Sequence, residues 1–186
     1  MTADPFPAYP LSALGSRIVV MGPSNAGKST LAYTIGRQTG INVIHLDQLR
    51  FMPNTDWELR SRSDFDALHA QAIAQDSWII EGNYSALVPA RLARATGVVL
   101  LDASVTRRFL RYLNRTLLTR KHRIGNLEGG QESLKWEMVT WILIKTRGSA
   151  ARLETLIHAS GKPYVFCKTA RQLDQLYSAW GLERPR

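Results

Sequence analysis

The sequence predicts an α/β fold, with a five-stranded parallel sheet covered by helices on both faces. Three observations support this prediction: short apolar runs alternate with segments of helical periodicity, the apolar runs are hydrophobic at consecutive positions, and a glycine-rich turn joins the first run to the first helical segment. Consecutive apolar residues are typical of parallel strands, which are buried on both faces. Strands that alternate with helices form such sheets through right-handed crossovers.

The predicted elements follow one another along the chain without internal repeats. The predicted strands cover residues 17–22, 41–46, 77–81, 97–102 and 163–167. The predicted helices cover residues 28–39, 64–75, 87–95, 105–118, 132–146 and 170–180, and a resumption of the fifth helix up to residue 159 is left open. Gly40 is expected to end the first helix, and Ser63 to cap the second. The buried stripe expected for the helix over residues 105–118 consists of Phe109, Leu110, Leu113 and Leu117.

The turn after the first predicted strand carries the pattern G-x-x-x-x-G-K-[ST], from Gly22 to Ser29. Its glycines allow a tight turn, and its backbone amides would point into one concavity at a helix N-terminus, where phosphate is favoured. Lys28 can reach the β- and γ-phosphates, and the hydroxyl of Ser29 can ligate magnesium. The pattern therefore predicts a magnesium nucleoside triphosphate as ligand, although a glycine-rich turn with a solvated lysine is the alternative. The residues expected to bind it are Gly22, Ser24, Asn25, Ala26, Gly27, Lys28, Ser29 and Thr30.

Three carboxylates are expected at the carboxyl ends of predicted strands, namely Asp47, Glu81 and Asp102. Ligands of open α/β sheets bind at this edge, so all three should share the rim with the phosphate loop. Magnesium in phosphoryl transfer needs carboxylate help, which either Glu81, through water, or Asp102 can supply. Both assignments stay open here, as does a role in a helix cap or turn. His45, one position before the rim, is expected to be structural.

The chain has a formal net charge of +9, and much of this charge lies in one segment. Seven basic residues and no acidic ones occur within seventeen positions: Arg107, Arg108, Arg111, Arg115, Arg120, Lys121 and Arg123. Arg108, Arg111 and Arg115 recur at helical spacing along one face. Because bidentate arginines suit a transferring phosphoryl group, we interpret this face as a phosphate clamp. A solvated helix face and a contact surface for nucleic acid are the alternatives.

The composition indicates how the chain is divided into domains and where in the cell the protein is expected. Three prolines in the first ten residues predict a loose, flexible tail over residues 1–16, ahead of a single domain over residues 17–186. No apolar run approaches the length of a membrane span and the chain begins without signal-peptide features, so a cytoplasmic protein without membrane contacts is expected. Cys167 is the only cysteine and is expected in a buried strand, which excludes cysteine-based metal sites. A monomer and a homodimer are both left open.

Four segments together resemble the adenylate-kinase-like P-loop kinases: the phosphate loop, HLDQLR after the second predicted strand, WIIEGNYS around the third, and the arginine-rich helix. Within that group the chain is most similar to the family of DNA topology modulation proteins. The resemblance covers the chain from about residue 17 to residue 180. It implies a three-layer P-loop NTPase fold with an acceptor-binding insertion over residues 48–76 and a lid over residues 119–131.

The resemblance also implies roles on the acceptor side. The Asp-x-x-Arg formed by Asp47 and Arg50 matches the acceptor site, where the arginine would hold the acceptor. The Asp-Gly of these kinases is replaced by residues 81–82, Glu-Gly, and their following proline-arginine by residues 83–85, Asn-Tyr-Ser. Trp57 lies in the irregular segment after Asp47, where an acceptor would be covered. The expected acceptor-binding set is Asp47, Arg50, Trp57, Gly82, Asn83, Tyr84 and Arg91.

On the nucleotide side, the resemblance implies that Arg111 and Arg115 contact ATP. Arginines of the lid would be among Arg120 and Arg123. The expected catalytic set is Lys28, Asp47, Glu81, Arg111, Arg115 and Arg123, the metal being held by Ser29 and, through water, by Glu81.

These observations predict a kinase that uses ATP and Mg²⁺ and transfers the γ-phosphoryl group to a small acceptor, a nucleotide or a nucleoside. The alternative is an ATP-dependent regulator that binds nucleic acid through the basic segment, with an affinity that falls steeply with salt. Asp47 bears on the type of acceptor. A phosphate acceptor needs no base, whereas a hydroxyl acceptor gains from a carboxylate within hydrogen-bond reach.

Overall fold

The computed structural model describes residues 6–55, 57–118 and 149–185, and for residues 115–118 and 149 it describes the backbone only. Three predicted features therefore lie outside the described residues, namely the lid over residues 119–131, its arginines Arg120 and Arg123, and the helix over residues 132–146. The resumed helix, which the sequence left open, is present as α7 (Ser149–Ala159).

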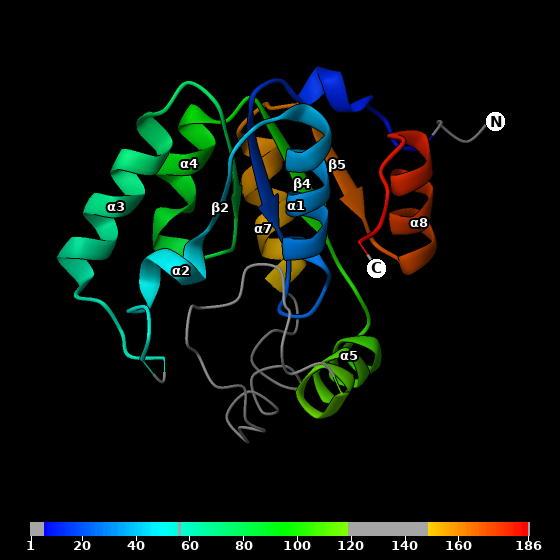
Figure 1. The fold of residues 1–186 in the computed structure, drawn as a ribbon. Coiled ribbons are helices and arrows are strands. Elements are labelled where there is room, and N and C mark those ends of the chain that lie inside the picture. Colours follow the sequence, from blue (N-terminus) through cyan, green and yellow to red (C-terminus); the bar gives the residue numbers. More distant parts are fainter. Residues whose placement is uncertain (1–5, 56, 119–148, 186) are drawn as a thin grey trace.

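Five parallel strands form one sheet, as predicted (Figure 1). β1 (Arg17–Met21) lies at its centre, and the strand order is β2-β3-β1-β4-β5. The remaining strands are β2 (Val43–His45), β3 (Trp78–Glu81), β4 (Gly97–Leu101) and β5 (Tyr164–Cys167). Because β3 and β4 both flank β1, the carboxyl ends of both neighbours lie next to the turn that follows β1.

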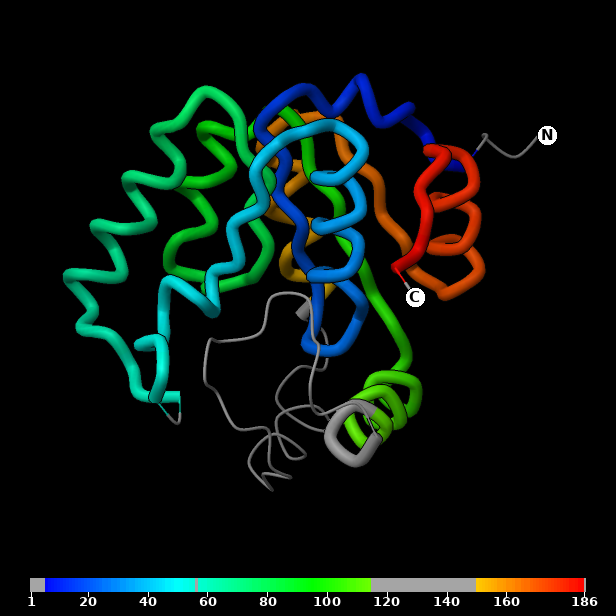
Figure 2. Tube along the Cα trace, viewed as in Figure 1, coloured from blue at the N-terminus to red at the C-terminus, as the bar shows by residue number. Residues whose placement is uncertain are grey.

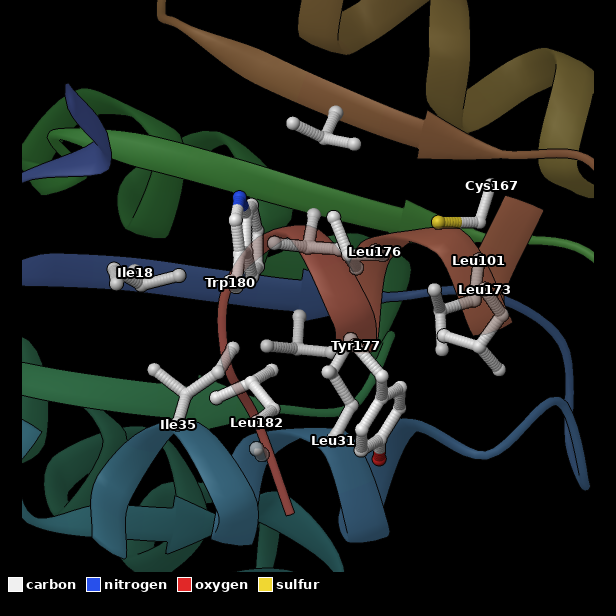
Figure 3. Close-up of a cluster of buried hydrophobic side chains, with 14 of the residues drawn as sticks. Ile18, Leu31, Ile35, Leu101, Cys167, Leu173, Leu176, Tyr177, Trp180 and Leu182 are labelled. Atoms are coloured by element: carbon white, nitrogen blue, oxygen red, sulfur yellow. The ribbon is translucent and has the colours of Figure 1, made fainter. Parts of the chain in front are cut away.

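Helices cover both faces of the sheet and complete the three predicted layers (Figure 1). One face is covered by α1 (Lys28–Thr39) and α8 (Ala170–Ala179), and the other by α3 (Arg62–Ala74), α4 (Val88–Arg94) and α7. Side chains alternate along a strand, so Ile18 and Val20 of β1 enter the core under α1 and α8, whereas Val19 and Met21 enter the opposite core. Figure 3 shows the first of these cores. None of the described helices is long and apolar enough to cross a membrane.

The N-terminal segment differs from the predicted loose tail. Residues Leu11–Leu14 form a 3-10 helix, η1, and the side chain of Leu14 is fully buried in the core shared with α1 and α8. The hydroxyl of Thr96 donates a 2.7 Å hydrogen bond to the carbonyl oxygen of Leu14. Gly97 permits this approach, because a Cβ at that position would lie 2.5 Å from the Cβ of Leu14. The prediction of a loose tail is therefore wrong for residues 11–14, which burial of Leu14 fixes to the domain.

The segment after β2 contains more regular structure than predicted. α2 (Leu46–Arg50) begins directly after β2, so Asp47 lies in the first turn of a short helix rather than directly at the carboxyl end of a strand. A hairpin follows, in which the backbone N–H of Arg60 donates a 2.8 Å hydrogen bond to the carbonyl of Arg50. α3 then begins at Arg62, two residues before its predicted start. Its cap is consequently Ser61 and not Ser63, and the Ser61 hydroxyl accepts from the N–H of Asp64 at 3.1 Å.

Helix α5 (Val105–Leu118) has the predicted bounds, but Phe109 and Leu113 of the predicted buried stripe are only half-buried, and the side chain of Leu117 lies outside the described residues. Figure 2 shows it beyond the carboxyl ends of the strands, apart from the helices that cover the sheet. Leu110, which was expected in the stripe, is 59% exposed, whereas Arg108 and Tyr112 are buried. α5 does not lie on a face of the sheet, so its apolar side does not pack into either sheet core.

Candidate active site

The turn between β1 and α1 forms the phosphate loop that the pattern predicts. Gly22 has a φ of 139°, and a Cβ there would lie 2.2 Å from the carbonyl oxygen of Leu101, so both the conformation and the space require glycine. Lys28 begins α1 and turns back over the loop, where its Nζ donates to the carbonyl of Pro23 at 3.2 Å. The remaining predicted loop residues are Ser24, Asn25, Ala26 and Gly27, and Ser29 and Thr30 lie in the first turn of α1.

Glu81, at the end of β3, lies at the centre of a cluster of polar side chains beside this loop. Its Oε2 accepts a 3.2 Å hydrogen bond from the hydroxyl of Ser29 and lies 3.0 Å from Nδ1 of His45. Its Oε1 lies 3.6 Å from Nζ of Lys28. The predicted neighbourhood of Lys28, Ser29 and Glu81 is thus present, with His45 as a fourth member.

The surroundings of Glu81 keep its carboxyl group ionised. Burial alone would raise its pKa, but the hydrogen bond from His45, the charge of Lys28 and the hydrogen bond from Ser29 lower the pKa below its ordinary value. A carboxylate can only accept hydrogen bonds, so Nδ1 of His45 carries the proton that they share. The result is a buried negative charge that faces both the lysine and the serine of the phosphate loop.

Asp102, the other carboxylate next to β1, has different partners. Its Oδ1 accepts a 2.8 Å hydrogen bond from the N–H of Ala103, in the turn that leads to α5. Burial lowers the pKa of Arg108, and the charge of Asp102 opposes that shift. Of the two carboxylates that the sequence left open, Glu81 is therefore the one that contacts the serine of the phosphate loop.

Arg111 of α5 contacts the backbone of the phosphate loop, and its predicted contact with ATP stays a prediction. Its guanidinium donates to the carbonyl oxygens of Ala26 at 3.0 Å and Asn25 at 3.3 Å. Burial lowers its pKa, and the neighbouring charges of Arg107 and Arg184 lower it further. Arg115 lies in the last turn of α5 and its side chain is outside the described residues, as is the whole of Arg123.

The residues predicted to bind the acceptor lie in α2, in the hairpin, in the loop after β3 and, for Arg91, in α4. The hydroxyl of Tyr84 donates a 2.8 Å hydrogen bond to Oδ1 of Asp47, and the Tyr84 ring packs edge-on against Phe65, with 5.0 Å between centroids. Burial raises the pKa of Tyr84, and the charge of Asp47 adds to this effect. The guanidinium of Arg50 lies 5.5 Å from the centroid of Phe65 and donates to the carbonyl of Arg60. These contacts bring Asp47, Arg50 and Tyr84 together, as predicted.

Trp57 lies in the hairpin and is half-buried. Its ring packs edge-on against Phe51, with 5.2 Å between centroids, and its backbone has a φ of 61°. Phe51 in turn pairs with Leu59 across the hairpin. Through Phe51, Trp57 thus stabilises the hairpin, which is the segment predicted to cover an acceptor.

Asn83 and Arg91, both predicted to bind the acceptor, form hydrogen bonds with backbone groups of nearby loops. The side chain of Asn83 accepts from the N–H of Gly22 at 3.0 Å and donates to its carbonyl at 2.9 Å. Arg91 has no exposed surface and donates to the carbonyls of Gly82, at 2.8 Å, and Asn83. Gly82 packs against Leu46. In this structure backbone groups occupy the side-chain amide of Asn83 and both terminal nitrogens of Arg91, and a role of either residue in binding the acceptor stays a prediction.

Comparisons with known proteins agree on the fold. No family model and no curated protein matches the chain. Among solved structures, a shikimate kinase from Acinetobacter baumannii in complex with shikimate is 14% identical, covering 88% of this chain and 89% of that chain at a TM-score of 0.53. A shikimate kinase from Bacteroides thetaiotaomicron is 16% identical, with 88% and 94% covered and a TM-score of 0.52. A gluconokinase from Sinorhizobium meliloti 1021 is 17% identical, with 77% and 98% covered and a TM-score of 0.44.

Together with the phosphate loop, the similarity to the two shikimate kinases defines the fold of the protein. The chain has the P-loop NTPase fold in the form also found in shikimate kinases. At such low identity the likeness concerns the fold alone, since one fold hosts many activities. The closer resemblance to the DNA topology modulation proteins stays a prediction, because none of these matches addresses it.

Proposed function

We propose that the protein is a magnesium-dependent kinase that transfers the γ-phosphoryl group of ATP to a small acceptor. The observation that carries this proposal is the contact of Glu81 with both Lys28 and Ser29 at the phosphate loop. Hydroxyl and carboxylate oxygens are the ligands that magnesium prefers, so this donor set fits the metal. The similarity of the fold to two shikimate kinases supports the same class of activity.

Each side chain has a defined task under this proposal. Lys28 and Arg111 supply positive charge to the phosphates, which is the main contribution that proteins make to phosphoryl transfer. The Ser29 hydroxyl donates a hydrogen bond to Glu81, and the lone pairs of the Ser29 oxygen stay available for the metal. Glu81 would orient water on the metal. Magnesium, when bound, would neutralise charge on the β- and γ-phosphates.

On the acceptor side, Asp47 is the carboxylate positioned to receive a proton. Tyr84 holds one of its oxygens, which fixes the orientation of the group. A hydroxyl acceptor, such as that of a nucleoside, would use this base, whereas a nucleotide that accepts on phosphate would not. Arg50 would bind the acceptor after exchanging its backbone partner.

The test is ADP release from magnesium ATP, screened against nucleosides, nucleoside monophosphates and small hydroxylated metabolites. We expect one acceptor class to stimulate release strongly. Lys28→Ala should lower the rate by about 100-fold or more, because it removes a charge made available to the transition state. Lys168→Ala is the matched control, since Lys168 lies on the surface and pairs with Glu154. Asp47→Asn should abolish transfer to a hydroxyl acceptor with ATP binding intact, and should change transfer to a phosphate acceptor little.

The alternative of a nucleic-acid-dependent regulator makes the opposite prediction. In that case none of the small acceptors stimulates ADP release, and release rises on adding DNA or RNA in a strongly salt-dependent way. The described part of α5 gives this alternative limited support, because Arg108 is buried and Arg111 contacts the phosphate loop. Stimulation by nucleic acid alone would contradict the proposed kinase activity and favour the regulator.

A further inference from the structure

The proposed function leaves unused one side chain of the Glu81 cluster, His45. Two donors from different elements meet at Oε2 of Glu81: the hydroxyl of Ser29 from α1 at 3.2 Å, and Nδ1 of His45 from the end of β2 at 3.0 Å. His45 and Glu81 are both buried. The contact therefore lies inside the protein, next to the place where the phosphates would bind.

The sheet register brings His45 to this place. His45 and Glu81 are paired positions of neighbouring parallel strands, so their side chains leave the sheet on the same face. Two positions earlier, Val43 and Ile79 are also paired and belong to the core beneath α1. The same face therefore carries α1, whose first turn holds Lys28 and Ser29. The contact follows from the backbone geometry of three elements.

The glutamate side chain needs this additional support. Glu has one more rotatable bond than Asp, and holding a long side chain in one conformation costs conformational entropy. Ser29 and His45 hold Oε2, whereas Lys28 lies 3.6 Å from Oε1. Without His45, Oε2 would keep the hydroxyl of Ser29 as its donor within the described part of the chain, and that hydroxyl is shared with the metal under the proposed function.

We infer that His45 is a positioning residue, which holds the Glu81 carboxylate in the orientation needed for binding of the magnesium nucleotide. This inference rests on the proposed function. Side chains that orient the groups around a metal commonly alter metal affinity by tenfold or more when replaced. His45 acts through Glu81 and does not itself touch the nucleotide or the metal.

The test is the binding of ATP to the whole protein as a function of magnesium concentration, without any acceptor. His45→Leu removes the donor. We expect it to raise the magnesium concentration for half-maximal binding by about tenfold or more, with metal-free ATP binding nearly unchanged. His45→Asn keeps an N–H donor at the position of Nδ1, and it should restore most of the loss. His158→Leu is the matched control, because His158 lies on the surface and bonds to Tyr164.

Four results would overturn the inference. His45→Leu could leave the magnesium dependence unchanged, or His45→Asn could lose as much as His45→Leu, which would show that shape rather than hydrogen bonding matters. Should His45→Leu fail to fold, the ¹⁵N shifts of the imidazole in the unmodified protein decide, because the inference requires the proton on Nδ1. ATP binding that ignores magnesium in the unmodified protein would instead contradict the proposed function itself, and the inference with it.

Discussion

At the scale of single residues, His69 makes the stability of the fold depend on pH. It lies in α3 with 2% of its surface exposed, and within the described part of the chain its Nε2 has no hydrogen-bond partner. Burial lowers its pKa from 6.5 to about 4, and the charge of Arg91 adds to this effect while Asp66 opposes it. The folded protein therefore holds His69 neutral in a range where the unfolded chain would protonate it.

This difference predicts a loss of stability in acid. Above the unfolded pKa of 6.5 the neutral form prevails in both states, and stability does not depend on this group. As the pH falls from 6.5 toward 4, only the unfolded state takes up the proton, so the free energy of unfolding decreases by up to about 1.4 kcal/mol per pH unit. His69→Leu should flatten this dependence in urea denaturation, and His158→Leu should not. Equal slopes for all three proteins would contradict the assignment.

The chemistry-bearing residues were predictable to different degrees. Lys28 and Ser29 follow from a local pattern with a fixed spacing, and Glu81 follows from its place at the end of an apolar run. The sequence predicts only a structural role for His45 and not its contact with Glu81, because this contact depends on the register between β2 and β3, which one sequence does not reveal. The backbone contacts of Asn83 and Arg91 were not predicted for a related reason. Nothing in the sequence shows that the backbone of the phosphate loop and of the adjoining loop lies within their reach.

At the scale of elements, Asn83 joins two loops that start at neighbouring strands. Its amide continues the pairing of β1 with β3 by one step, since it bonds to both the N–H and the carbonyl of Gly22. The preceding step is the bond from the N–H of Gly82 to the carbonyl of Val20 at 3.1 Å. The side chain thus ties the loop after β3 to the first residue of the phosphate loop.

Asn83→Ala should accordingly weaken ATP binding more than acceptor binding. Two hydrogen bonds of about 1 kcal/mol each are lost, which corresponds to a decrease in ATP affinity of up to about 30-fold if the loop is no longer held in place. Asn42→Ala is the matched control, because the Asn42 side chain is exposed. Calorimetric titration with ATP and the KM for the acceptor separate the two effects. A raised acceptor KM with unchanged ATP affinity would support the original interpretation of Asn83.

The elements themselves were largely predictable because their ends carry local signals. Gly40 ends α1 in the left-handed conformation, as predicted. The prediction was wrong where tertiary contacts decide. α2 replaces the end of a predicted strand and part of an irregular segment, and α5 buries Arg108 and Tyr112 while Leu110 is exposed.

At the scale of the whole molecule, the two ends of the described chain meet. Figure 2 shows the N-terminal segment running across to α8. The indole N–H of Trp180 donates a 3.1 Å hydrogen bond to the carbonyl of Tyr9, and Leu14 shares a core with Leu176 and Leu182. The sequence predicted the layers, because they follow from alternating strands and helices. It did not predict this closure, because three prolines near the N-terminus are also typical of a loose tail.

Leu14 therefore belongs to the cooperative core, and its truncation should destabilise the entire fold. Leu14→Ala should lower the free energy of unfolding by about 3 to 5 kcal/mol, since a fully buried leucine loses its transfer free energy and leaves a cavity that Gly97 and Thr96 cannot fill. Leu110→Ala is the matched control, and at 59% exposure it should change stability by less than about 1 kcal/mol. Urea denaturation followed by tryptophan fluorescence measures both. Equal, small effects would mean that residues 11–14 contribute little to stability, whereas the expected difference would place the N-terminal segment inside the folding unit that supports the phosphate loop.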